Sequence, residues 1–107
     1  MDDIALGFKA GDLDAIIGII SNLHTITKAS VFGSRAKGNY QKGSDVDIVI
    51  WSASEDDALQ LRSVLNDETL LPYKFDVINY YQIDNRDLKE HVDRQGVIIY
   101  QTLNVNN

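Results

Sequence analysis

The sequence predicts an α+β fold, in which a small mixed β-sheet is layered with helices mainly on one of its faces. Short apolar segments with the character of strands alternate with segments whose apolar residues recur at helical spacing. Two of the strand-like segments, at 28–32 and 45–51, are joined by a turn and a loop in place of a long helix. The 107 residues correspond to one small domain, with its core at about 12–100.

The first half of the chain is expected to begin with a helix whose role is packing. Residues 11–23 place apolar side chains at helical spacing, and Asp12 suits the N-terminal cap of this helix. The apolar segment 28–32 then forms a strand, which ends at a Gly33-Ser34 turn.

The second half is expected to alternate strands and helices. Ser54 is followed by acidic residues, which stabilise the positive end of a helix, so a helix is predicted to begin there. The last helix is capped by Asp84 or Asn85 and is ended by Gly96. The remaining segments are expected as a helical turn at 35–38, a loop at 39–43, a strand at 45–51, a helix from Ser54 to about Asn66, a strand at 75–80, a helix at 84–95, and an apolar segment at 97–100 that is either a strand or a helical turn.

The formal net charge of −6 is distributed unevenly along the chain. Residues 25–44 hold four of the ten basic residues and no acidic residue, whereas the other six basic residues share the rest of the chain with all sixteen acidic ones. An acidic body of this kind does not suit a long polyanion, so direct binding to duplex nucleic acid is not expected. A single basic stretch suits a compact anion such as a nucleoside triphosphate.

The lack of cysteine and of long apolar runs in the sequence excludes further classes of protein. The chain has no cysteine, which excludes disulfides and zinc–thiolate sites. No apolar run approaches the roughly 18 residues of a membrane span. The N-terminus carries Asp2 and Asp3 in place of the basic start of a signal peptide. We therefore expect a cytoplasmic protein without membrane contact.

Two carboxylates one residue apart, Asp45 and Asp47, begin the second strand. Because side chains alternate between the faces of a strand, both carboxylates are expected on one face. A pair of adjacent carboxylates suits Mg²⁺ or Mn²⁺, which bind carboxylate and phosphate oxygens together. The alternative is the solvated face of an edge strand, although aspartate is depleted from strands.

The Gly33-Ser34 turn after the first strand is a candidate anion site. Glycine permits close backbone approach to a ligand, and Ser34 adds a hydroxyl next to the backbone N–H groups of a helix start. An ordinary loop with Ser34 as a helix cap is the alternative. The basic residues that could hold phosphate are Arg35, Lys37 and Lys42, and for Arg35 a structural pairing with a carboxylate is about equally expected.

Together, Phe32-Gly33-Ser34 and the later Asp45-Val46-Asp47-Ile48 resemble the signature of the polymerase-β-like nucleotidyltransferase superfamily. The fuller pattern, GSRAKG followed by SDVDIVI, is similar to the minimal nucleotidyltransferases (MNT), the antitoxins of HEPN/MNT toxin–antitoxin pairs. The resemblance covers about residues 12–100 and includes the segment 93–100. It implies a third carboxylate on a later strand, a position that Asp76 fills.

The resemblance also implies a reaction. Asp45, Asp47 and Asp76 would hold two Mg²⁺ ions, or Mn²⁺, while Gly33, Ser34 and the basic residues bind the phosphates of ATP. AMP would then pass from ATP to a hydroxyl, which in MNT–HEPN pairs is a tyrosine of the HEPN toxin. A homodimer or a complex with that partner is expected.

Two other functions are compatible with the same residues. The chain could neutralise its partner by contact alone, or it could modify a small molecule such as an aminoglycoside. The filled carboxylate positions favour the enzyme, because a binding module has no reason to keep three acids that repel one another.

Overall fold

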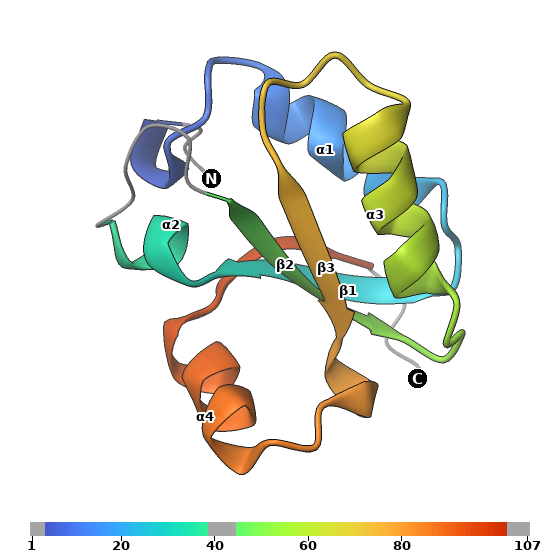
Figure 1. Ribbon diagram of the computed structural model, residues 1–107, viewed down its shortest axis with the longest axis vertical. Coiled ribbons are helices and arrows are strands. Elements are labelled where there is room, and N and C mark those ends of the chain that lie inside the picture. The colour runs from blue at the N-terminus through green and yellow to red at the C-terminus, as the bar shows by residue number, and fades with distance from the viewer. Residues whose placement is uncertain (1–3, 39–44, 103–107) are drawn as a thin grey trace.

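Four strands form a single mixed sheet in the order β3-β2-β1-β4. The computed structural model (Figure 1) describes residues 4–38 and 45–102. Strand β1 is antiparallel to β2 and β4, and β2 is parallel to β3. The elements in chain order are η1 (Ile4–Leu6), α1 (Asp12–Ser21), β1 (Ile26–Phe32), α2 (Ser34–Lys37), β2 (Val46–Ser52), α3 (Asp57–Asp67), β3 (Phe75–Asn79), η2 (Tyr80–Gln82), α4 (Arg86–Gln95) and β4 (Val97–Gln101). The predicted α+β fold is confirmed, and the ambiguous segment near the C-terminus is a strand.

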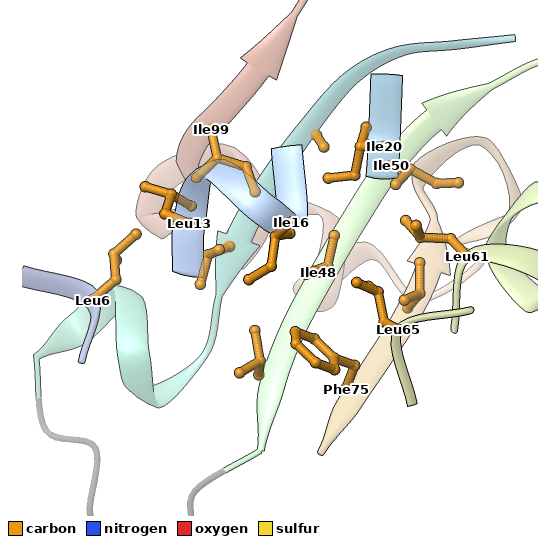
Figure 2. Packing of buried hydrophobic residues seen from close by; sticks show 14 of the residues in the cluster. Leu6, Leu13, Ile16, Ile20, Ile48, Ile50, Leu61, Leu65, Phe75 and Ile99 are labelled. Carbon is orange, nitrogen blue, oxygen red and sulfur yellow. The ribbon is translucent and has the colours of Figure 1, made fainter. Parts of the chain in front are cut away.

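The main core lies between one face of the sheet and helices α1 and α3. Three alternating residues of β2 point into it, and helix residues at 3.6-residue spacing meet them from the other side. Figure 2 shows this packing from close by. The residues that it labels include Leu13, Ile16 and Ile20 of α1, Ile48 and Ile50 of β2, Leu61 and Leu65 of α3, and Phe75 of β3.

The opposite face of the sheet carries a second, smaller cluster. Val49 of β2 packs there with Ile83 and with Val92 of α4. Helix α4 therefore lies on the other side of the sheet from α1 and α3, as Figure 1 shows. Because residues of β2 alternate, the face with Val49 is also the face of Asp47.

The starts of α1 and α3 differ from the sequence prediction, and the start of α4 matches one of the two predicted caps. Helix α1 is preceded by Gly11 at φ 89°, and Asp12 is not its cap because the Asp12 carboxylate accepts a 2.6 Å bond from the Tyr73 hydroxyl. Helix α3 begins at Asp57, not Ser54, because the buried Asp57 carboxylate accepts hydrogen bonds from the hydroxyls of Thr25 and Ser52. Helix α4 is capped by Asn85, whose Oδ1 accepts the Leu88 N–H at 3.1 Å.

None of the helices in the described ranges 4–38 and 45–102 has the length and apolarity needed to cross a bilayer.

The start of β3 is held in place by Asn66 of α3. The Asn66 carboxamide donates to the Phe75 carbonyl at 2.9 Å and accepts from the Phe75 N–H at 2.8 Å. On its other side β3 is joined to β2, where the Val46 N–H donates to the Lys74 carbonyl at 2.8 Å. The residue directly before Asp76 is therefore fixed from both sides.

Replacing Asn66 with alanine is expected to lower the free energy of unfolding by about 1–3 kcal/mol, because both backbone groups of Phe75 lose their partner. Denaturant titration measures the change. The adjacent, exposed Asp67→Ala is the matched control and is expected to stay within about 0.5 kcal/mol of the unmodified chain. Equal stability of the two variants would contradict the role assigned to Asn66.

Candidate active site

The two aspartates at the centre of the candidate site come from neighbouring parallel strands. Asp47 of β2 stands opposite Asp76 of β3 in the strand register. Paired residues of adjacent strands project from the same face of a sheet. The neighbours of Asp47, Val46 and Ile48, point into the main core on the opposite face. The structure therefore brings Asp47 and Asp76 together, on the face that α4 partly covers.

The pKa of Asp47 reflects two neighbouring carboxyl groups. Burial raises the pKa of Asp47 above its ordinary value of 3.8, and the charges of Asp76 and then of Asp45 raise it further. Asp45 and Asp76 are exposed, whereas Asp47 is half-buried. Asp45 immediately precedes β2, which begins at Val46, so the strand starts one residue later than the sequence predicts. Negative charge thus accumulates around the least solvated of the three groups.

Gly33 allows the turn after β1 to pass directly beside the Asp47 carboxylate. Its backbone has φ 78° and ψ −150°, which side-chain-bearing residues rarely adopt. A Cβ atom at Gly33 would lie 2.5 Å from the Asp47 Oδ2. Two independent constraints, conformation and space, therefore require glycine here.

Ser34 begins α2, the single helical turn that follows Gly33. The turn is closed by a 3.1 Å bond from the Lys37 N–H to the Gly33 carbonyl. Ser34 is half-buried, and Lys37 is exposed at the end of the turn. Lys42 lies outside the residues that the structure describes. Ser34 thus directly follows the glycine that borders Asp47, and the phosphate-binding roles of Ser34, Lys37 and Lys42 stay predictions.

Arg35 occupies a structural position. Its side chain is 4% exposed, and Nη1 donates to the carbonyl oxygens of Leu6 and Gly7 at 3.1 Å each. The guanidinium also lies over the rings of Phe8, at 5.4 Å, and Tyr73, at 5.2 Å. Of the two roles expected for Arg35, the geometry favours the structural one, and backbone carbonyls are among its partners.

Helix α4 adds a side chain that the sequence reasoning did not single out. The His91 ring lies edge-on to the ring of Phe32, with centroids 6.4 Å apart. Phe32 in turn pairs with Asp47 in the register of β1 and β2. His91 therefore borders the carboxylate face. No local signal marks it, because its position depends on how α4 packs back onto the sheet.

The carboxylates fit a hard divalent cation by donor type, since Mg²⁺ binds carboxylate oxygens. Within the described ranges, no group of three acidic, histidine or cysteine side chains lies close enough together to form a ready-made metal site. Asp47 and Asp76 are the pair that the strand register brings together for such an ion.

Comparison with known proteins decides the family. The sequence matches the family described as "Polymerase beta, Nucleotidyltransferase" over residues 14–104. The chain belongs to that family. The matched range includes the Gly33-Ser34 turn, Asp45, Asp47 and Asp76. A search among curated proteins found no match.

Solved structures share the fold of this nucleotidyltransferase domain. A toxin–antitoxin structure with AMP-PNP gives a TM-score of 0.71 at 22% identity, covering 86% of this chain and 75% of that chain. The toxin–antitoxin MntA-HepT gives 0.59 at 20% identity, with 88% and 74% covered. A tri-AMPylated Shewanella oneidensis HEPN toxin in complex with MNT antitoxin gives 0.57 at 20% identity, with 85% and 71% covered.

The two constraints on Gly33 can be tested by substitution. Gly33→Ala is expected to destabilise the chain by about 1–3 kcal/mol, because Cβ meets both the strained backbone and the Asp47 carboxylate. Gly18→Ala is the matched control, since Gly18 lies inside α1 with open space around its Cβ position, and it is expected to stabilise by about 0.5–1 kcal/mol. Thermal unfolding of both variants measures the difference. The two changes in stability are expected to have opposite signs, and changes of the same sign would contradict the proposed geometry.

The raised pKa of Asp47 has a consequence for stability. A carboxyl whose pKa is higher in the folded chain stabilises the fold while protonated, and this contribution is lost as pH rises through the folded-state pKa. Without divalent metal, Asp47→Asn is therefore expected to raise the melting temperature by a few degrees at pH 7. Below pH 3.8, the ordinary value, the advantage should disappear. Melting curves in chelator across this range measure it, and a lower melting temperature at pH 7 would oppose the electrostatic account.

Proposed function

We propose that this nucleotidyltransferase domain transfers AMP from ATP to a hydroxyl group of a partner protein. The observation that carries the proposal is the in-register pairing of Asp47 with Asp76 next to the Gly33 turn. Carboxylates on one face and an open glycine turn beside them suit a triphosphate with its cations.

Each residue has a role in the proposed reaction. Asp45, Asp47 and Asp76 would hold Mg²⁺, which when bound offsets the charge of the triphosphate and favours ionisation of the acceptor hydroxyl. Ser34 and the backbone after Gly33 would hold the β- and γ-phosphates, and Lys37 and Lys42 would balance the charge of the leaving group. The acceptor oxygen forms a bond to the α-phosphorus, the bond to the bridging oxygen breaks, and pyrophosphate leaves. The hydroxyl proton passes to solvent by way of Asp76, the more exposed carboxylate of the pair.

The proposed acceptor is a tyrosine of a HEPN-domain toxin, so that the chain acts as an antitoxin. Support comes from three solved structures with this fold that are toxin–antitoxin complexes, one of them with AMP-PNP and one with a tri-AMPylated HEPN toxin. The partner itself would complete the site.

The test is label transfer from α-labelled ATP, with Mg²⁺, to a HEPN-domain protein, for which the product of the neighbouring gene is the first candidate. Asp76→Asn is expected to lower the transfer rate at least about 100-fold, as loss of a transition-state charge partner does. Because Asp76 is exposed, the variant should remain folded, and the exposed Asp67→Asn serves as the control.

Two results would contradict the proposal. Inhibition of the partner without any label transfer, unchanged in Asp47→Asn, would establish neutralisation by contact alone. Label moving to an aminoglycoside but never to the protein would establish a small-molecule acceptor.

A further inference from the structure

A groove with a volume of about 480 Å³ lies along the outer edge of β3. Strand β3 is the last strand of the sheet, so no further strand covers this edge. Helix α3 forms one wall, and η2 with the start of α4 forms the other. The lining residues used below are Ala58 of α3, Val77 and Ile78 of β3, Gln82 of η2, Ile83, and Leu88 of α4.

The groove is lined mostly by apolar side chains. It covers only the second half of β3, because Asn66 is bonded to the first residue of the strand. The first residue of β3, Phe75, has both of its backbone groups bonded to Asn66. The groove begins beyond this point, at Val77, and runs to the far end of the strand. An occupant is therefore directed to the second half of β3.

The groove is continuous with the carboxylate face. Val77 directly follows Asp76, and Ile78 lies on the same face of β3 as Asp76 because it is two residues away. At about 3.3 Å per residue, the two side chains are roughly 7 Å apart along the strand. A group bound against Ile78 therefore lies next to the site where the acceptor hydroxyl must arrive.

The surroundings of the groove favour a protein as its occupant. Leu59 of α3 and Tyr81 of η2 are each 64% exposed, and they neighbour Ala58 and Gln82 of the lining. A small molecule inside the groove would leave both of these side chains in water, whereas a protein surface would cover them.

Charge at the rim indicates the chemistry of that protein. Asp84 is the charged residue of the lining, and Glu55 and Asp56 precede Ala58 at the α3 wall. All three are exposed acids, so the complementary segment carries basic side chains beside an apolar one.

We propose that this β3-edge groove docks a segment of the protein acceptor in which an apolar side chain is flanked by basic residues, and that docking presents the neighbouring hydroxyl to Asp76. The inference rests on the proposed function for the identity of the acceptor. It adds that acceptor recognition is separate from nucleotide binding, because the groove lies on the opposite side of Asp76 from the Gly33-Ser34 turn of β1.

Filling the groove tests the proposal. Gln82→Trp places an indole in the groove from an exposed position, and Gln60→Trp makes the same change at an exposed position of α3 outside the lining. The probe is the HEPN-domain protein of the label-transfer test. Gln82→Trp is expected to raise the KM for this acceptor by about tenfold or more, with the KM for ATP unchanged, whereas Gln60→Trp changes neither.

Reversing a charge at the rim of the groove gives a second test of the docking proposal. Asp84→Lys is expected to weaken acceptor binding several-fold, with the larger loss at low salt, and Asp14→Lys on α1 is the control of equal charge change. Binding is measured by calorimetry in an Asp47→Asn background, so that no transfer occurs during the titration.

The outcomes separate the two proposals. If the unmodified chain binds the HEPN-domain protein without transferring label, and Gln82→Trp abolishes binding, the docking site stands while the proposed reaction fails. If label is transferred and Gln82→Trp leaves the acceptor KM and affinity equal to those of Gln60→Trp, the docking site is overturned while the reaction stands. If the unmodified chain does not bind the HEPN-domain protein at all, the docking site is overturned as well.

Discussion

The register of β3 against β2 is the constraint on which the site depends. Side chains on a strand alternate with a period of two, so a slip of one residue would move Asp76 into the main core and bring Val77 beside Asp47. Apolar residues of β3 facing α3 oppose that slip, because Phe75 and Val77 would exchange their buried positions for exposed ones. Packing of apolar residues on one face of the sheet therefore determines which side chains lie beside Asp47 on the other face.

The arrangement around Asp47 has a cost that the rest of the fold offsets. A half-buried carboxylate with two like charges nearby, beside a glycine in a conformation other residues avoid, is unfavourable for folding. Conflicts of this kind concentrate at functional sites. The apolar side chains on either side of Asp47 in the strand, Val46 and Ile48, are fully buried and supply compensating stability.

The sequence predicted those features whose causes are local. Alternation located β2, the Gly33 turn followed from its strand, and the cap of α4 was narrowed to Asp84 or Asn85, of which the structure selects Asn85. What failed depends on distant residues. Asp12 is the first residue of α1 and not its cap, and its carboxylate accepts a hydrogen bond from Tyr73, 61 positions away. For Arg35 the sequence left two roles open, and only the fold shows the carbonyls, 28 and 29 positions earlier, to which it donates. Likewise, nothing near His91 in the sequence indicates that it borders the site, because the packing of α4 on the sheet places it there.

The burial of Arg35 joins two parts of the chain that would otherwise vary independently. Its guanidinium binds the carbonyls of the last residue of η1 and of the residue after it, while its backbone belongs to the turn that begins with Ser34. A displacement of the amino-terminal segment, for instance by a bulky fusion, would thus be transmitted to the Gly33-Ser34 turn through the Arg35 side chain. A tag at the carboxy-terminal end avoids this route.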